Sequence, residues 1–345
     1  MTLAGPDTRR QRRDGSRRPR LGFLGVGWIG RNRLQALAAT GRADVVAVAE
    51  PDVKMRDQAL AAAPGALGLD GLEALLGLDL DGVVIATPSA LHAGQAVAAL
   101  ERGLAVFCQK PLGRDEAETR AVVQAARRAD RLLGVDLSYR HLAAVAAVRG
   151  LLAGRELGRV YAADLTFHNA YGPDRAWFTQ RSRAGGGCLI DLGTHLLDLA
   201  LWLTDSQTVE VTGSVLMRRG AALAPDGDEV EDFALAAFAL DAGVQARLAC
   251  SWFLPAGRDC VIELVLYGTD GAAAVRNVAG SFYDFRAEHW RGTQTEVIAE
   301  PPDDWGGRAL GQWTKALADS PGFDESADRY TALAAVLDQV YRAAA

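Results

Sequence analysis

Between residues 21 and 136, short apolar runs alternate with stretches whose apolar residues have helical spacing. The apolar runs are Leu21–Gly25, Asp44–Ala49, Gly82–Ala86, Leu104–Phe107 and Leu132–Asp136, and the helical stretches are Trp28–Ala39, Val53–Ala63, Ala90–Arg102 and Asp115–Ala129. Strands that alternate with helices in this way form βαβ units, and their parallel sheet is buried on both faces. The sequence therefore predicts an α/β domain over residues 21–140.

A glycine-rich motif lies at the turn between the first strand and the first helix. Residues 25–30 read Gly-Val-Gly-Trp-Ile-Gly, with the spacing G-x-G-x-x-G. The first glycine permits a tight turn, the second lets a pyrophosphate approach the backbone, and the third lets helix and strand pack closely. The helix N-terminus adds unpaired N–H groups. We predict that a dinucleotide binds Gly25, Gly27, Trp28, Ile29 and Gly30. A glycine turn in a βαβ protein without a nucleotide is the alternative.

Glu50 follows Gly30 by twenty residues and stands at the end of the second predicted strand. A carboxylate at this place accepts hydrogen bonds from ribose hydroxyls and repels a 2′-phosphate, which favours NAD over NADP. Lys54 and Arg56 lie just downstream and would weaken that preference. A solvated acid at a strand end is the alternative interpretation.

Thr87 and Pro88 follow the third strand, at the edge where open α/β sheets bind ligands. His92 stands near the start of the next helix. We assign these three residues to the cofactor site, with a capping or packing role as the alternative for His92.

Gln109 and Lys110 follow the fourth strand and precede Pro111, and we assign both to the cofactor site. A lysine at this edge of the sheet lies beside the predicted cofactor, where it can donate to a reacting oxygen, and burial readily shifts the pKa of a lysine. A surface lysine before a turn proline is the alternative.

After about residue 140 the pattern changes. A helix is predicted at His141–Ala153 and two closing helices at Trp305–Ala318 and Ser326–Ala344, and the β-rich runs between them are Val160–His168, Val209–Met217, Phe233–Leu240, Val244–Phe253 and Val261–Tyr267. The runs partly alternate and are separated by turn signals, so we predict a largely antiparallel sheet. Residues 141–345 are therefore expected to form an α+β domain.

A glycine run at 185–187 leads into a stretch that carries Asp191, His195 and Asp198. On a helix, Asp191 and His195 are four residues apart and share a face. A carboxylate that orients an imidazole gives a pair suited to proton transfer near neutral pH. One alternative is a helix N-terminal acid beside a packed histidine. Another is a metal site, which we do not expect because no second His or Cys stands at ligand spacing.

These motifs together resemble a known family. The glycine motif at 25–30, Thr87-Pro88 through His92, Lys110-Pro111, Tyr139-Arg140 and the glycine run into Asp191 and His195 occur in the order and spacing of the Gfo/Idh/MocA oxidoreductases, from about residue 20 onward. The resemblance implies an N-terminal NAD(P)-binding Rossmann domain and a C-terminal α+β domain with a large open, mostly antiparallel sheet. It also implies a closing helix that packs back on the first domain, and homo-oligomers, dimers or tetramers, formed through sheet faces.

The resemblance further implies reversible hydride transfer between NAD(P) and a secondary alcohol of a sugar or cyclitol. It makes Lys110, Asp191 and His195 the catalytic set and Lys110–Pro111 a cis peptide. In the resulting hypothesis His195 removes the hydroxyl proton, Asp191 orients His195 or a neighbouring hydroxyl, and Lys110 hydrogen-bonds the reacting oxygen. One departure is Gln109, which stands where the family usually has Glu. It removes a charge that would favour a protonated lysine.

The segment 167–178, FHNAYGPDRAWF, is rich in aromatic rings and polar tips. Such a surface suits a polyhydroxylated ring, so the residues that we predict to bind substrate are Tyr139, Arg140, His168, Trp177, Asp191 and His195. The alternatives are that Trp177 and Phe178 belong to the core, and that Arg140 binds a carboxylate or phosphate. Trp252, in a predicted strand, is assigned to the core.

Charge and cysteine usage restrict the partners. Residues 1–20 contain seven Arg and two Asp, net +5, and the remainder has 30 bases and 41 acids, net −11. We interpret residues 1–20 as a disordered arm, and the acidic body argues against a nucleic-acid ligand. No run of 18 residues lacks a polar residue, so no membrane partner is expected. Four scattered cysteines without a C-x-x-C favour a reduced, cytoplasmic setting.

Two other functions stay open at this point. One is a biosynthetic reductase of a keto-sugar or keto-cyclitol, because the sequence does not set the direction of the reaction. The other is a non-catalytic sensor that binds the dinucleotide on the same fold. The Gln109 departure and the arginine-rich arm favour the sensor weakly, and Lys110, Asp191 and His195 argue against it.

Overall fold

The computed structural model describes residues 18–224 and 227–344. Most of the predicted disordered arm, residues 1–17, lies outside these described residues. Its last residue does not: Arg20 opens the first strand, where its backbone N–H donates to Asp81 Oδ2 at 2.8 Å.

The first domain is a six-stranded parallel sheet in the order β3-β2-β1-β4-β5-β6. The strands are β1 (Arg20–Leu24), β2 (Asp44–Ala49), β3 (Leu67–Leu69), β4 (Gly82–Ile85), β5 (Ala105–Cys108) and β6 (Leu133–Val135). The helices are α1 (Trp28–Thr40), α2 (Val53–Leu60), α3 (Leu72–Leu76), α4 (Ser89–Glu101) and α5 (Glu116–Ala129). Strand order reverses between β1 and β4, and this switch point is where such sheets bind dinucleotides.

The sequence pattern missed β3 and α3. Strand β3 has three residues, a glycine at its centre and an edge position in the sheet, so it lacks the apolar run of a buried strand. Helix α3 is five residues long, too short for helical periodicity to stand out.

The second domain is built on a nine-stranded sheet in the order β15-β14-β13-β12-β7-β11-β10-β8-β9. Its strands are β7 (Val160–Asn169), β8 (Val209–Arg218), β9 (Ala221–Ala222), β10 (Phe233–Leu240), β11 (Gln245–Ser251), β12 (Cys260–Gly268), β13 (Ala272–Asn277), β14 (Phe285–Arg291) and β15 (Gln294–Ala299). Among the described strands of this sheet, β7 and β11 pair in parallel and every other pair is antiparallel. The large, mostly antiparallel sheet expected for this half is confirmed.

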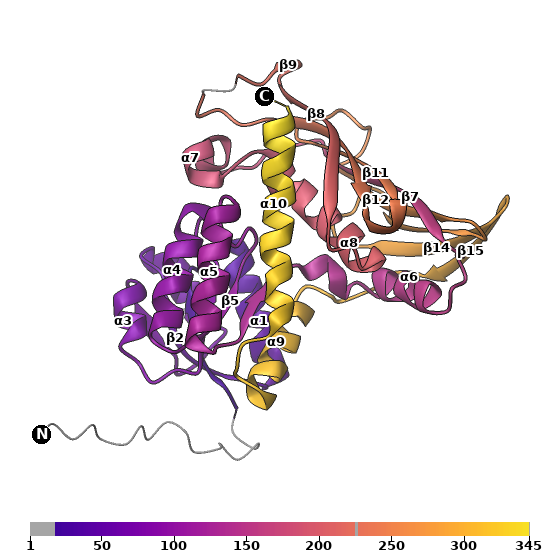
Figure 1. The fold of residues 1–345 in the computed structure, drawn as a ribbon. Helices are drawn as coiled ribbons and strands as arrows, with labels where there is room; N and C mark the ends of the chain where they lie inside the picture. Colours follow the sequence, from indigo (N-terminus) through magenta and orange to yellow (C-terminus); the bar gives the residue numbers. More distant parts are fainter. Residues whose placement is uncertain (1–17, 225–226, 345) are drawn as a thin grey trace, which may run out of the picture.

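Helices α6 (Ala143–Ala153) and α8 (Thr194–Thr204) cover one face of this sheet (Figure 1). A short helix, α7 (Arg181–Ala184), and a turn of π-helix, η4 (Leu189–Gly193), precede α8. By length and composition the run 181–204 could cross a membrane, but 78% of its apolar window is buried inside the structure, as in the core helix of a globular protein.

The two last helices join the domains. Helix α9 (Arg308–Asp319) returns to the first sheet, where Trp313 packs on Phe107 with ring centroids 5.7 Å apart. A Cβ at Gly134 would lie 2.5 Å from Trp313 Cδ1, so this close contact requires glycine there. Helix α10 (Asp328–Ala343) runs along the junction, against α5 on one side and β8 and α8 on the other (Figure 1). The closing helix implied by the family resemblance is thus present.

Candidate active site

A cleft of about 1350 Å³ separates the carboxyl ends of the first sheet from the second domain. The glycine loop, Glu50 and Lys110 line it from one side, and Asp191, His195 and the aromatic segment around Trp177 line it from the other. The cleft is larger than a usual single-ligand pocket of about 300–1,000 Å³, so it has room for a dinucleotide and a second molecule.

The glycine loop has the shape that a dinucleotide needs. Gly25 has φ +83°, and a Cβ there would lie 2.7 Å from the carbonyl carbon of Ala86. A Cβ at Gly30 would overlap the carbonyl oxygen of Gly25. A Cβ at Gly27 would meet no atom within 4 Å, so the space beside it opens to the cleft. Each glycine therefore has the geometry that the motif requires, and the loop has the space that a pyrophosphate would need.

Glu50 lies at the end of β2 beside this loop. Its Oε2 accepts from the N–H of Val26 at 3.0 Å and its Oε1 from the N–H of Asp52 at 3.2 Å. The nearby Arg56 turns away from the carboxylate, because its guanidinium donates to Asp70 and to the carbonyl oxygens of Glu50 and Leu69. A cation that would attract a 2′-phosphate is thereby engaged with the protein.

His92 is buried, and both its ring nitrogens lie 2.7 Å from carbonyl oxygens: Nδ1 from Pro111 and Nε2 from Thr87. It therefore joins the loop after β4 to the loop after β5, at the residue next to Lys110. The peptide bond between Lys110 and Pro111 is cis, as the resemblance implies.

Lys110 reaches across the cleft to Asp191 in the second domain. Its Nζ donates to Asp191 Oδ1 at 2.7 Å and to the Asp191 carbonyl oxygen at 2.6 Å. The other carboxylate oxygen accepts from Trp252 Nε1 at 3.2 Å. The lysine is thus an ordered part of the site rather than a surface residue. Trp252, assigned to the core from the sequence, is 3% exposed and also positions this carboxylate.

His195 faces the same cleft from the first turn of α8. Its ring packs on Tyr139 with centroids 4.6 Å apart, and its Nδ1 is buried without a hydrogen-bond partner among the described residues. Burial, and then the positive charges of Lys110 and Arg33, lower the pKa of His195 well below its usual value. The ring is therefore neutral at physiological pH and able to accept a proton.

One detail of the sequence hypothesis needs correction: Asp191 does not hydrogen-bond His195. Asp191 lies in the π-helical turn η4, where a wider turn changes the four-residue spacing that a regular helix would give. Its carboxylate oxygens instead accept from Lys110 and Trp252. Asp191 therefore orients Lys110, and His195 is held by packing on Tyr139.

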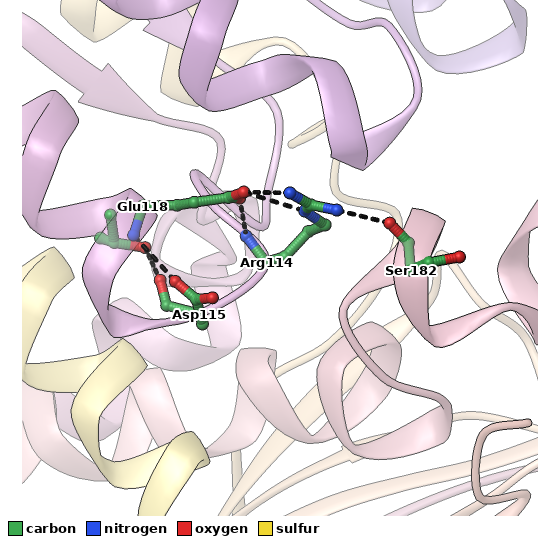
Figure 2. Close-up of polar contacts among 5 residues, drawn as sticks. Arg114, Asp115, Glu118 and Ser182 are labelled. Carbon is green, nitrogen blue, oxygen red and sulfur yellow. Dashed lines mark hydrogen bonds and ion pairs between the residues drawn. The ribbon is translucent and has the colours of Figure 1, made fainter. Parts of the chain in front are cut away.

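Two side chains, Glu231 and Arg114, anchor the segment around the glycine run that precedes η4. Glu231, fully buried, accepts from the N–H groups of Gly187 and Leu189 at 3.0 and 2.9 Å and from the Tyr341 hydroxyl at 2.8 Å. In Figure 2, Arg114 pairs with Glu118 and donates to the carbonyl oxygen of Ser182.

Arg114 lies four residues after Lys110, so this contact ties the lysine's loop to α7, just before the glycine run. Sequence reasoning missed all of these anchors, since no local motif marks them.

Two predicted substrate residues, Arg140 and His168, do not line the cleft. Both Nε and an Nη of Arg140 donate to the carboxylate of Asp198 in α8, with Nε to Oδ2 at 2.7 Å. His168 bonds Ser251 at 2.8 Å and does not line the cleft, whereas its strand neighbours Phe167 and Asn169 do. Successive residues of a strand face opposite sides of the sheet, so His168 lies on the other face.

Two other predicted substrate residues do line the cleft. Trp177 stacks on Phe178 with centroids 3.9 Å apart, and neither ring is buried in the core. Tyr139 is largely buried and packs on Trp305 at 5.2 Å as well as on His195, so it supports the site from behind.

A buried polar network adjoins Lys110. Asp136, at the end of β6, accepts from Arg33 Nε at 2.6 Å and from the Gln109 side-chain amide, and all three residues line the cleft. Arg33 and Asp136 were not singled out from the sequence, because each comes from a different element of the first domain. Among residues 18–224 and 227–344, no group of three His, Cys, Asp or Glu side chains could hold a metal ion.

Comparison with known proteins agrees with this geometry. Residues 20–137 match the model of the oxidoreductase family with an NAD-binding Rossmann fold, and residues 145–274 match the model of the GFO/IDH/MocA C-terminal domain. The solved structure of GenD2 from gentamicin A biosynthesis, in complex with NAD, superposes with a TM-score of 0.81 and 23% identity, covering 100% of this chain and 97% of that one.

Curated relatives extend the match. A protein of Amycolatopsis mediterranei (strain S699), provisionally named UDP-kanosamine synthase oxidoreductase subunit, is 35% identical over 276 residues, 76% of each chain. The 1,5-anhydro-D-fructose reductase of Ensifer adhaerens is 31% identical over 75% of this chain and 76% of its own. One family model matches the first domain and the other matches the second, and these relatives are matched over about three quarters of their length. The chain therefore belongs to the GFO/IDH/MocA family of oxidoreductases.

Proposed function

We propose that the protein is an NAD-dependent dehydrogenase that interconverts a secondary alcohol and a ketone on a sugar or cyclitol. The observation that carries the proposal is the meeting of Lys110, Asp191 and a neutral His195 at one cleft that also contains the glycine loop. Bound nicotinamide supplies the hydride acceptor or donor, which is chemistry that no side chain provides.

The protein's own groups handle the proton and the oxygen. In the oxidation direction His195 accepts the proton of the substrate hydroxyl, and Lys110 hydrogen-bonds the same oxygen as it gains negative charge. Asp191, held by Trp252, keeps the ammonium group of Lys110 oriented. In reduction the same atoms work in reverse, with His195 returning the proton.

The choice of NAD over NADP rests on Glu50. Its carboxylate stands where the adenosine ribose of a dinucleotide lies in this fold, and Arg56 is engaged with Asp70 and backbone carbonyls. A 2′-phosphate would meet the negative charge of Glu50 while Arg56 is engaged elsewhere, so NADP is disfavoured; the exposed Lys54 offsets part of that repulsion.

The substrate class rests on the cleft wall and on the relatives. Trp177 and Phe178 offer apolar ring faces, and Asn169 has a buried amide oxygen without a partner among the described residues. Such a wall suits the C–H patches and hydroxyls of a polyhydroxylated ring. Relatives include the inositol 2-dehydrogenase of Rhizobium meliloti (strain 1021), at 30% identity.

The reverse reaction, reduction of a keto-sugar or keto-cyclitol, is the second candidate. The relative named 1,5-anhydro-D-fructose reductase favours it. We also propose a homo-oligomer, since the outer face of the nine-stranded sheet exposes the paired residues Val215 and Leu235. A cytoplasmic location is consistent with four cysteines that are all free thiols.

The test is absorbance of NADH during turnover. The purified protein is mixed with NAD or NADP and a panel of inositols, aldoses and their keto forms, beside His195→Asn and a direct NADH titration. We expect turnover in the wild type, loss of it in the variant, and equal NADH binding in both. Full turnover by His195→Asn would refute the role of His195. Tight NADH binding with no turnover on any substrate would favour a non-catalytic sensor.

A further inference from the structure

Three exposed aromatic side chains lie at the mouth of the active-site cleft. Tyr171, Phe253 and Tyr283 are 54%, 56% and 56% exposed. One exposed aromatic residue is ordinary on a protein surface, but a group of them beside a cleft is typical of a binding surface. None of the three takes part in the proton and hydride transfer described above.

The three side chains come from loops at one end of the nine-stranded sheet. Tyr171 follows Asn169, the last residue of β7, by two positions, and Phe253 follows Ser251, the last residue of β11, by two. Tyr283 lies in the loop between β13 and β14. Strands β11, β7, β12 and β13 are consecutive in the sheet, so these loops are neighbours in space.

Contacts between the loops hold them together. The Tyr171 hydroxyl donates to Asp259, and the N–H of Phe253 donates to the carbonyl oxygen of Tyr171 at 3.4 Å. A Cβ at Gly280 would lie 3.3 Å from the backbone nitrogen of Asp259, so the loop that carries Tyr283 lies against the same residue. We call Tyr171, Phe253 and Tyr283 the outer aromatic platform.

The backbone at Phe253 is strained although its ring is not buried. Phe253 has φ +60°, in the left-handed region that bulky residues rarely adopt. Its ring lies over Gly172, where a Cβ would be 1.9 Å from Phe253 Cζ, yet more than half of the residue stays exposed. Core packing therefore does not explain this ring, and strained residues of this kind cluster where ligands bind.

The outer aromatic platform is continuous with the cleft. Tyr283 lines the cleft itself, and so does Asn169, two residues before Tyr171. Trp252, the chain neighbour of Phe253, donates to Asp191 in the catalytic set. A substrate that is held at Asp191 and is longer than one ring therefore meets the platform as it leaves the cleft.

The platform has the chemistry that a sugar ring needs. Aromatic rings offer flat apolar faces to C–H patches, and the exposed polar side chains Arg258 and Asp259 stand beside them for hydroxyls. We infer that the substrate is a glycoside of at least two units: the ring that is oxidised lies in the cleft, and a second sugar ring of the same molecule lies on the outer aromatic platform. The inference rests on the proposed function and narrows its substrate class.

The test compares substrates that share the ring to be oxidised. Methyl β-glucoside is compared with cellobiose, methyl α-glucoside with maltose, and myo-inositol with galactinol, by NADH formation. The variants are Tyr171→Ala, Tyr171→Phe and Phe253→Gly, since glycine adopts φ +60° without strain. Tyr161→Ala is the matched control, because Tyr161 is 47% exposed and lies at the other end of β7. Thermal unfolding and molecular mass by light scattering are measured for each variant.

For at least one pair, we expect kcat/KM of the wild type to be about tenfold or more higher with the two-ring substrate, the effect of two aromatic contacts. Tyr171→Ala and Phe253→Gly should each lower this ratio by about threefold or more. Tyr171→Phe keeps the ring and should retain most of the ratio. Tyr161→Ala should leave it unchanged.

Two-ring substrates that react no faster than their one-ring partners would overturn the inference, and so would a ratio that neither Tyr171→Ala nor Phe253→Gly lowers. A lower molecular mass in these variants would assign the platform to a contact between subunits and would also overturn it. If Phe253→Gly does not fold, Tyr171→Ala decides alone. Turnover of one-ring substrates only would leave the proposed function standing, whereas a wild type that oxidises no substrate of either kind would contradict the proposed function itself.

Discussion

Replacing Arg140 with methionine should destabilise the protein and leave substrate binding unchanged. Arg140 and Asp198 pair with two contacts, and their side chains are 20% and 4% exposed. Burial raises the pKa of Asp198, and the Arg140 cation opposes that shift. Without Arg140, a buried carboxylate in the middle of α8 would have lost its ion-pair partner.

The expected loss of stability is large. Breaking a buried ion pair by removing one partner costs about 3–5 kcal/mol, because the other charge remains buried. At about 2–4 °C per kcal/mol, the scale for chains of 150–250 residues, the melting temperature should fall by roughly 6–20 °C. Since the pKa of Asp198 is already above its usual value in the folded state, the variant should lose stability as the pH rises from about 4 toward 7.

Thermal unfolding followed by circular dichroism, at pH 5 and pH 7, measures this effect. Arg149→Met is the matched control. Both Arg140 and Arg149 lie over the Trp202 ring, 5.7 and 4.1 Å from its centroid, but Arg149 is exposed and has no ion pair to Asp198. It should cost less than about 1 kcal/mol. A melting temperature within about 2 °C of the wild type for Arg140→Met, together with a KM for substrate raised about tenfold, would show that Arg140 binds substrate and that our reasoning is wrong.

Three further changes test the site. Trp252→Phe removes the donor to Asp191 and should lower kcat by about tenfold, the value of one hydrogen bond to a charged group; an unchanged kcat would show that this contact has no role. Since the pKa of His195 is well below 6.5, kcat/KM for oxidation should stay level from pH 8 down to 6.5 and fall only below it. In Lys110→Met the residual activity should fall at a higher pH than in the wild type, because a positive charge that lowers the pKa of His195 is gone; a lower midpoint would contradict this. Glu50→Ser removes the charge that opposes a 2′-phosphate, so the ratio of kcat/KM for NAD over NADP should fall, and an unchanged ratio would refute the role of Glu50.

The first domain was predictable because its signals are local. Alternating apolar runs and helical stretches identified β1, β2, β4, β5 and β6, and a motif of six residues located the dinucleotide loop. Each of these features depends on residues close together in the chain. The antiparallel character of the second sheet was predictable, but its number of strands was not. Strands β13, β14 and β15 are short or partly exposed, and no clear alternation of apolar and polar residues marks them.

The identities of Lys110, Asp191 and His195 were also available from the sequence, but their pairing was not. Helical spacing predicted an Asp191–His195 contact. Because Asp191 lies in a π-helical turn and the two domains meet at the cleft, its carboxylate instead accepts a hydrogen bond from Lys110, 81 positions away. Trp252 reaches the same carboxylate from 61 positions away. Such contacts depend on how two separately formed domains meet.

The sequence by itself determined the elements of the first sheet, the dinucleotide loop and the residue types of the site, because periodicity, glycine spacing and strand ends are properties of neighbouring residues. Tertiary structure alone decided that Arg140 belongs to a buried ion pair and His168 to the far face of a sheet. It likewise decided that Asp136 fixes the side chain of Gln109. The physical reason is that a hydrogen bond or ion pair selects its partner by distance in space, and only packing of the two domains brings these distant residues within reach.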